Sequence, residues 1–184
     1  MKQPTFRGAM IAAAVITGLF TLLTTLGYAF FCTGWLLSTA VTFGTTFYHF
    51  AMRLAVGYLI PNRFDYHSKW FRCKRFEAPL YKVLRVKKWK DHMPTFDPQL
   101  FSISETPLEN IVRNMCQAEV VHEVIILFSF VPLLFYLIWD SFFVFFITSV
   151  LAAAVDILFV IMQRYNRPRL VRLMNKQLSR RETL

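Results

Sequence analysis

Four long apolar stretches divide this chain, with polar and basic segments between them. The first runs from Ala9 to Phe31 without a charged residue, and the second covers about residues 36–60. The third and fourth cover about residues 120–139 and 141–162. A helix rises about 1.5 Å per residue and the hydrocarbon core of a bilayer is about 30 Å thick, so each stretch can cross a membrane. The pattern predicts an all-α integral membrane bundle of about four transmembrane helices, in a single domain over residues 1–184.

Prolines and one capping motif mark where these helices are expected to begin, bend or end. Thr106, Pro107 and Glu109 have the spacing of a capping box, which predicts a helix that starts there and continues into the third apolar stretch. A proline disfavours helix at the preceding residue, and inside a helix it removes a backbone hydrogen bond. We therefore expect the chain to break or kink at three prolines: Pro61, Pro132 and Pro168.

Composition and charge support a membrane protein and set its expected orientation. The chain is 55% hydrophobic and has a net charge of +10. All but one of its 21 basic residues precede the first span, lie in residues 61–118 or lie in residues 163–184. Because Lys and Arg collect on the cytoplasmic side of spans, both termini and residues 61–118 are predicted to be cytoplasmic. The mixture of aromatic and basic residues between Trp70 and Lys90 fits an interfacial segment between helices two and three, so we expect anionic lipid rather than nucleic acid as a partner.

Ionisable residues also lie inside two of the predicted spans. Counting about 1.5 Å per residue from the cytoplasmic ends, Arg53 lies about 10 Å deep and Asp156 about 9 Å deep. An intramembrane charge is costly without a partner, so we predict that these two side chains pair or share one hydrogen-bonded network. His49 lies one helical turn deeper than Arg53. A structural ion pair and a substrate-binding role both fit this pattern.

The start of the third span carries the most chemically informative motif. Glu119 shares a helix face with His122 and Glu123, three and four residues further on. A histidine beside carboxylates at a membrane boundary has the surroundings of a tuned general base. A Glu-x-x-His pair is also half of a di-metal carboxylate site, but the sequence holds no second copy. A metal-dependent membrane enzyme using Glu119 and His122 is therefore a weaker alternative.

Three blocks in the C-terminal part of the chain resemble a known family. They are Val-Lys-Lys-Trp-Lys at residues 86–90, Gln-Ala-Glu-Val-Val-His at residues 117–122 and Gln-Arg-Tyr-Asn-Arg-Pro-Arg-Leu at residues 163–170. In this order and spacing they resemble the glycosyl-4,4'-diaponeurosporenoate acyltransferase family of bacterial membrane proteins. The resemblance implies an enzyme of the bacterial plasma membrane that esterifies a sugar hydroxyl of a carotenoid glycoside with a fatty acyl chain.

The resemblance and the polar residues together suggest a mechanism. We expect His122 to remove the proton from the acceptor's hydroxyl or amine and Glu119 to orient His122. The acyl donor is expected to be acyl-CoA or a phospholipid, the acceptor a lipid or glycolipid, and no cofactor or metal is expected. The side chains expected to bind substrate are Arg164, Asn166, Arg167, Lys87, Lys88, Trp89, Lys90, Arg53, His49, Gln163, Glu123 and Asp156.

A second class of function also fits the residues. A membrane protein that binds lipid or scaffolds a partner without catalysis would use the same basic clusters for their charge alone. Lysine would then replace Arg164 or Arg167 with little loss, whereas a bidentate site would not tolerate that exchange. The sequence gives no indication of the oligomeric state.

Overall fold

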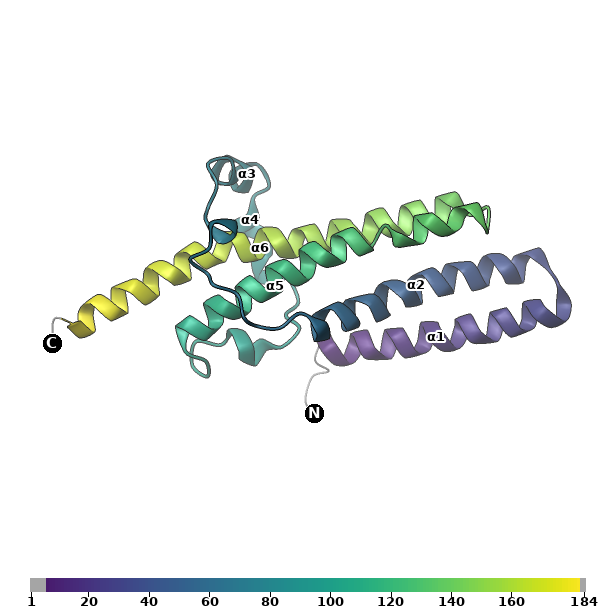
Figure 1. Ribbon diagram of the computed structural model, residues 1–184, viewed down its shortest axis with the longest axis horizontal. Coiled ribbons are helices and arrows are strands. Elements are labelled where there is room, and N and C mark those ends of the chain that lie inside the picture. Colours follow the sequence, from purple (N-terminus) through teal and green to yellow (C-terminus); the bar gives the residue numbers. More distant parts are fainter. Residues whose placement is uncertain (1–5, 183–184) are drawn as a thin grey trace. The chain divides into compact units, whose positions relative to one another are not determined.

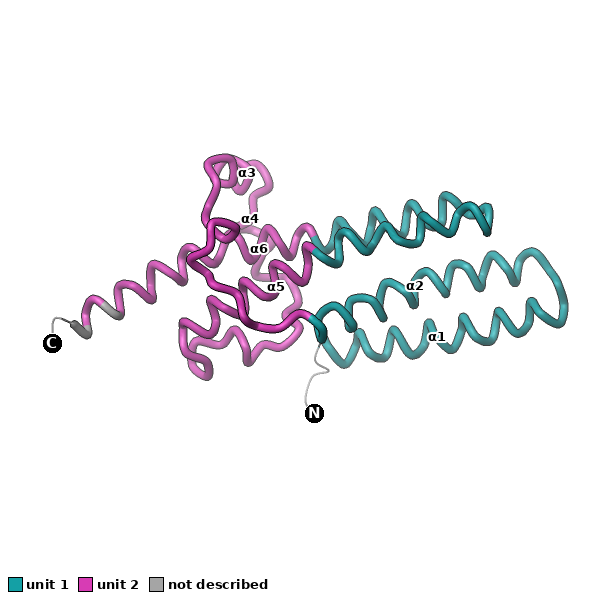
Figure 2. Tube along the Cα trace, viewed as in Figure 1, with its two compact units in different colours: residues 1–59, 124–156 teal, residues 60–123, 157–184 magenta. Residues whose placement is uncertain are grey.

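The computed structural model describes residues 6–182, and every regular element in that part of the chain is a helix (Figure 1). Residues 1–59 and 124–156 form one compact unit, called unit 1 here, and residues 60–123 and 157–184 form a second, unit 2 (Figure 2). The all-α class is therefore confirmed. The single domain over residues 1–184 stays a prediction, and Lys2 and the last two residues of the predicted tail lie outside the described residues.

Unit 1 begins with a hairpin of two 26-residue helices, α1 (Phe6–Phe31) and α2 (Gly34–Leu59). The helices approach closely because small residues face large ones. A Cβ atom added to Gly18 would lie 3.1 Å from the ring of Phe47, so a larger residue there would displace that ring by a few tenths of an ångström. The rings of Phe20 and Phe43 stack 4.9 Å apart across the same interface. This is the small-residue packing typical of helices in membranes.

Two further long helices contribute to both units. Helix α5 (Leu108–Phe128) starts within two residues of the predicted position, after a turn in which the Thr106 hydroxyl donates to the Gln99 carbonyl (2.9 Å). The helix predicted to end near Trp139 changes type before that residue. The α-helix ends at Phe128, and a 3-10 segment, η4 (Val131–Leu137), follows with Pro132 in its first turn. Proline has no amide hydrogen to donate, and its ring clashes with the preceding turn. Near Pro132 the α-helix therefore ends, where a break or kink was expected.

Helix α6 (Phe142–Glu182) is 41 residues long and continues through Pro168. A break or kink was expected at this proline, but the helix does not end there. The side chains of Arg164 and Arg167, one turn and one residue before the proline, are both held by hydrogen bonds to other elements. These contacts hold the helical turn that precedes the proline, and tertiary packing can override a local preference.

The segment between α2 and α5 consists of short helices: η1 (Lys69–Phe71), α3 (Glu77–Val83), α4 (Val86–Trp89), η2 (Lys90–His92) and η3 (Pro98–Phe101). Polar side chains attach both ends of this segment to α5. The Asn114 amide donates to the Leu100 carbonyl (2.8 Å), and the Gln117 amide donates to the Ile60 carbonyl (2.7 Å). These bonds tie both ends of the polar segment to the helix that also carries Glu119.

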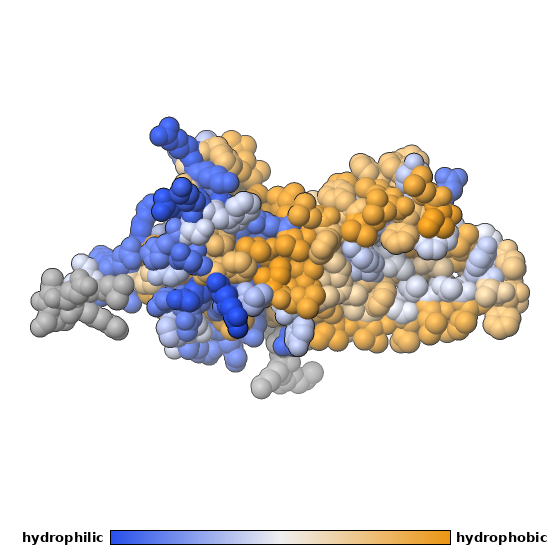
Figure 3. Space-filling view, viewed as in Figure 1, coloured by the Kyte–Doolittle hydropathy of each residue, from blue (hydrophilic) through white to orange (hydrophobic). Residues whose placement is uncertain are grey.

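Within residues 6–182, three helical stretches are long and apolar enough to cross a membrane: Phe6–Phe31, Leu108–Leu137 and Phe142–Gln177. The exposed surface is apolar over α1 and α2 and hydrophilic over the connecting segment (Figure 3). The protein is thus a membrane protein. Helix α2 has the length of a span but carries His49 and Arg53, and the fourth span and the cytoplasmic location of both termini stay predictions.

The predicted pairing of Arg53 with Asp156 is confirmed within unit 1. One guanidinium nitrogen of Arg53, Nη2, donates to the Asp156 carboxylate and to the Ala152 carbonyl (3.0 Å). The other, Nη1, donates to the His49 carbonyl (3.0 Å). Because the Asp156 side chain is only 2% exposed, its charge depends on this partner.

Substitution of one partner of this pair should destabilise unit 1 strongly. Asp156→Leu leaves Arg53 with no carboxylate at this site and should lower the free energy of unfolding by about 3–5 kcal/mol. The double variant Arg53→Met, Asp156→Leu removes both charges and should recover much of that loss. Thermal unfolding of wild type, the single variants Asp156→Leu and Arg53→Met, and the double variant in lipid nanodiscs measures the effect. A double variant as unstable as the sum of the two single variants would show that the pair contributes no coupling.

Candidate functional site

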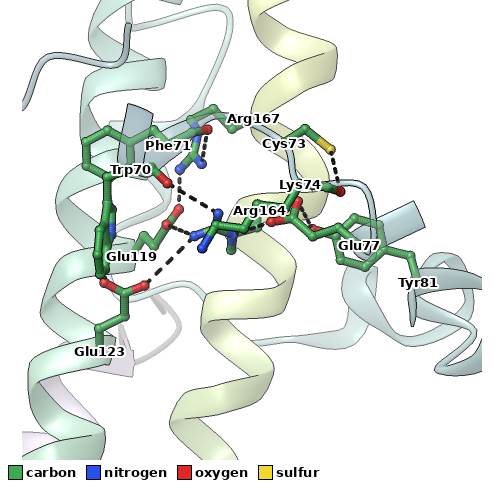
Figure 4. A network of polar contacts seen from close by, with 10 residues as sticks. All are labelled: Trp70, Phe71, Cys73, Lys74, Glu77, Tyr81, Glu119, Glu123, Arg164 and Arg167. Carbon is green, nitrogen blue, oxygen red and sulfur yellow. Dashed lines mark hydrogen bonds and ion pairs between the residues drawn. The ribbon is translucent and has the colours of Figure 1, made fainter. Parts of the chain in front are cut away.

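A network of ion pairs joins α5, α6 and the connecting segment in unit 2 (Figure 4). Its centre is the carboxylate of Glu119, which is fully buried. One oxygen, Oε1, accepts from Nη1 of Arg164 (2.7 Å), and the other, Oε2, accepts from Nη1 of Arg167. Two guanidinium groups therefore neutralise one carboxylate that has no contact with water.

Arg167 connects this centre to the segment before α3. Its second nitrogen, Nη2, donates to the carbonyl of Phe71 (2.7 Å), and its guanidinium lies 4.9 Å from the centre of the Phe71 ring. Arg167 is only 3% exposed, and Phe71 is also buried. The cation–π contact and the hydrogen bond hold η1 against α6.

Arg164 connects the centre to α3 and to the aromatic part of the segment. Its Nε donates to Glu77 (2.9 Å), and its Nη2 makes a longer bond to the Trp70 carbonyl (3.3 Å). The Trp70 indole in turn donates to Glu123 (3.1 Å), whose carboxylate lies 4.0 Å from Arg164. The network thus holds three carboxylates and two guanidinium groups.

Helical spacing brings these residues together. Glu119 and Glu123 are four residues apart on α5, and Arg164 and Arg167 are three apart on α6, so each helix presents its charges on one face. The Tyr81 hydroxyl donates to Glu77 (2.9 Å) one turn earlier in α3. Long helices therefore set the positions of the arginines, and α3 adds a carboxylate to them.

Two groups of the network outside the predicted spans have shifted pKa values. Burial acts to raise the pKa of Glu77, but the hydrogen bond from Tyr81 and the charge of Arg164 outweigh it and hold the pKa below its ordinary value. Burial and the nearby Glu77 carboxylate raise the pKa of the Tyr81 phenol well above its ordinary value. Tyr81 therefore stays protonated as a donor while Glu77 stays charged as an acceptor.

His122 lies one turn beyond Glu119 on α5. It is half-buried, and its ring stacks on that of Phe159 from α6, with centroids 4.6 Å apart and planes 4° from parallel. This stacking fixes the plane of the imidazole. The carboxylate that was expected to orient His122 accepts from Arg164 and Arg167, so the role of Glu119 toward His122 stays a prediction.

The structure groups the remaining candidates differently from the sequence. Gln163 is buried and Asn166 half-buried on α6, beside the two arginines. Lys87 and Lys88 are exposed on α4. Trp89 and Lys90 make local contacts. The Trp89 indole donates to the Leu84 carbonyl (3.0 Å), and Lys90 pairs with Asp91 (2.5 Å). His49, Arg53 and Asp156 belong to unit 1.

Sequence reasoning missed three members of the network: Trp70, Glu77 and Tyr81. Trp70 and Tyr81 were assigned to the membrane interface, and Glu77 lies among basic residues that dominate the local charge. The spacing of Glu77 and Tyr81, four residues apart, is the one signal that links two of them. Among residues 6–182, no three His, Cys, Asp or Glu side chains gather so as to hold a metal ion.

Helices long and apolar enough to cross a membrane define the chain as a membrane protein, and unit 2 of this protein contains a buried polar network and a stacked histidine. Residues 67–176 match the sequence model of one protein family, the glycosyl-4,4'-diaponeurosporenoate acyltransferases. Because the match covers more than half of the 184 residues, the chain belongs to this family and is an acyltransferase. No curated protein and no solved structure matches the chain. The matched residues include the whole ion-pair network and leave α1 and α2 outside.

Neutralising Glu119 should destabilise unit 2. Glu119→Gln leaves the buried guanidinium of Arg167 without its carboxylate, and we expect a loss of about 3–5 kcal/mol in the free energy of unfolding. The matched control is Glu109→Gln, which removes an exposed pair with Arg113 on the same helix and should cost no more than about 0.5 kcal/mol. Chemical unfolding in detergent micelles measures both. Equal losses in the two variants would contradict a structural role for Glu119.

The lowered pKa of Glu77 predicts a stability contribution that disappears in acid. A carboxyl group whose pKa is lower in the folded state stabilises the fold above its ordinary value, here 4.5, and the contribution is lost as the pH falls through the folded pKa. Wild type should therefore be more stable than Glu77→Gln at neutral pH, and the difference should shrink toward about pH 3. Unfolding temperatures across this range test it, with Glu105→Gln at an exposed position as the control. A constant difference would show that Glu77 acts through packing alone.

Proposed function

We propose that this protein transfers a fatty acyl chain from acyl-CoA or a phospholipid to a hydroxyl group of a glycolipid at the cytoplasmic boundary of the bacterial plasma membrane. The observation that carries the proposal is the half-buried imidazole of His122, held flat against Phe159 one turn from the buried ion-pair network. Family membership supports acyl transfer, and the apolar helices support a membrane-bound acceptor.

His122 acts as the general base in this proposal. One ring nitrogen accepts the proton of the acceptor hydroxyl while the oxygen attacks the carbonyl carbon of the donor. The tetrahedral intermediate then expels the thiolate of coenzyme A or the alkoxide of a lysophospholipid, which takes the proton back from His122. One ester bond forms and one thioester or ester bond breaks. The stacking on Phe159 keeps the attacking geometry constant because it fixes the ring plane.

Arg164 supplies the positive charge for the oxyanion. Two of its nitrogens make short bonds to carboxylates, whereas Nη2 makes only the 3.3 Å bond to the Trp70 carbonyl. That donor is the easiest to redirect toward a developing negative charge. Glu119 acts as a positioning residue that holds Arg164 and Arg167 in place, and Gln163 and Asn166 line the same part of α6.

The exposed basic residues give the donor a place to bind. Lys87 and Lys88 lie on α4 with their side chains in solvent, and Lys90 follows them. Ammonium groups so placed bind the phosphates of coenzyme A or of a phospholipid headgroup. The acceptor is a lipid that carries a sugar hydroxyl, and the activity of the family makes a glycosylated carotenoid the first acceptor to test.

The test is lipid mass spectrometry of membranes that contain the wild-type protein, His122→Ala or no protein, in a host supplied with a glycosylated carotenoid. Wild type should produce an acylated glycolipid, and His122→Ala should lower its formation by roughly 10²–10⁴-fold, the usual contribution of a general base. His67→Ala, at an exposed position of the connecting segment, is the matched control and should keep full activity. Full activity of His122→Ala would remove this residue from the base role.

Arg164→Lys separates the enzyme from a lipid-binding scaffold that uses charge alone. Lysine keeps the charge but has no planar fork with which to bridge Glu77, Glu119 and an oxyanion, so acyl transfer should fall. Binding to vesicles that contain anionic lipid should change little. If no acylated product forms with any acceptor while vesicle binding persists, the protein is a scaffold.

A further inference from the structure

Unit 1 contains a pocket, half open to its surroundings and called the chamber here, that the reaction proposed above does not use. Its volume is about 490 Å³, and residues of α1, α2, η4 and α6 line it, including Thr21, Val41, Gly44, Pro132 and Phe145. Protein interiors are close-packed and contain few voids larger than a water molecule. A chamber of this size lies in the range of ligand sites.

The walls of the chamber are mainly apolar, and three of the five lining residues that carry hydroxyl groups have those groups bonded within the protein. The Thr21 and Thr45 hydroxyls donate to carbonyls of their own helices, at 2.8 and 2.7 Å. The Tyr48 phenol donates to the Phe128 carbonyl (2.9 Å). These groups are already paired, so the chamber is lined mainly by methyl groups, aliphatic side chains and rings. Such walls fit a hydrocarbon chain and do not fit a sugar or a phosphate.

Two buried polar side chains of unit 1 have no hydrogen-bond partner within the described residues, and each follows a residue that lines the chamber by one helical turn. His49 is 7% exposed and neither of its ring nitrogens is bonded, and the hydroxyl of Ser149 is fully buried and unbonded within the described residues. His49 follows Thr45 by one turn of α2, and Ser149 follows Phe145 by one turn of α6. Buried polar groups are nearly always paired. The two therefore mark where a ligand's polar atom would bind.

We propose that unit 1 binds one fatty acyl chain, with its hydrocarbon part in the chamber and its carbonyl or carboxyl oxygen at His49 and Ser149. A 150 Å³ cavity holds benzene, and by that scale the chamber has room for roughly twenty carbon atoms. This matches a chain of common membrane length. The assignment depends on the proposed acyl transfer only for the chemical class of the ligand.

Photolabelling of the full-length protein in nanodiscs tests the site without turnover. The probe is hexadecanoic acid that carries a diazirine near its methyl end, and adducts are located by peptide mass spectrometry. Adducts should fall on chamber residues such as Val41 and Pro132, and excess unlabelled hexadecanoic acid should remove them. Adducts confined to exposed residues of α1 such as Leu22 and Leu23, or adducts that resist competition, would overturn the proposal.

Filling the chamber provides the matched pair of variants. Val41→Phe places a ring in the chamber and should lower the yield of chamber adducts at least about tenfold, since a pocket discriminates a single methylene by about that factor. Val15→Phe makes the same change at a position of α1 that is 55% exposed, and it should leave the yield unchanged. Equal yields from the two variants would overturn the site.

The proposed binding of the ligand's oxygen at His49 has a separate test. His49→Leu removes two unpaired buried nitrogens, so the unfolding temperature should rise while the yield of chamber adducts falls. A lower unfolding temperature with unchanged labelling would show that His49 has no part in ligand binding. Labelling of the chamber together with full activity of His122→Ala would retain the site and reject only the proposed base, so the two proposals fail separately.

Discussion

The burial of the Glu119 carboxylate is the constraint on which unit 2 depends. Removing a carboxylate from water costs several kcal/mol even after the surroundings relax, and only close opposite charge with additional hydrogen bonds offsets that cost. Arg164 and Arg167 supply both. The arginines have donors left over, and these bind Glu77 and the carbonyls of Trp70 and Phe71. A connecting segment with no long helix of its own thereby acquires a defined position against α5 and α6.

The same constraint determines where a reactive group can lie. A site works best when its groups are carried by rigid elements whose neighbours hold them in place. His122 meets this condition because its helix is attached to α6 through Glu119 and its ring is held by Phe159. The two charged clusters of the protein thus differ in kind. Arg53 and Asp156 form a compact pair among helices, whereas the cluster around Glu119 joins helices to an irregular segment beside a histidine.

How far the sequence predicts this structure depends on the range of the interaction. The long apolar stretches predict the helices because their signal is local and repeated. The pairing of Arg53 with Asp156 was predicted because charges at similar depth in a membrane have few other partners. The arginines of α6 were expected to face a ligand, yet most of their donors bind protein groups. Glu77, the partner of Arg164, lies 87 residues away in a basic stretch, and no local pattern links the two.

The two prolines of the predicted long helices also show where local sequence signals stop predicting the structure. Helix α6 continues through Pro168, whereas α5 ends before Pro132. The sequence marks both prolines as weak points, and the outcome depends on what holds the neighbouring turns. Near Pro168 the side chains of Arg164 and Arg167 are bonded to other elements, and the helix continues. At Pro132 the α-helix has already ended at Phe128 and the chain adopts a 3-10 conformation.

The threonines of α2 change how that helix meets its solvent. Their hydroxyls donate to carbonyls one turn earlier, as at Thr39 and Thr42 (2.7 and 2.9 Å) and at Thr45 and Thr46 (2.7 and 2.8 Å). A hydroxyl that already has an acceptor loses little when it leaves water, because the penalty falls on unpaired polar groups. A hydropathy sum over residues assigns each threonine its full polarity. It therefore makes this helix more polar than its surface is. With its hydroxyl bonded to its own helix, each of these threonines presents mainly a methyl group to its surroundings and is chemically closer to valine than to serine.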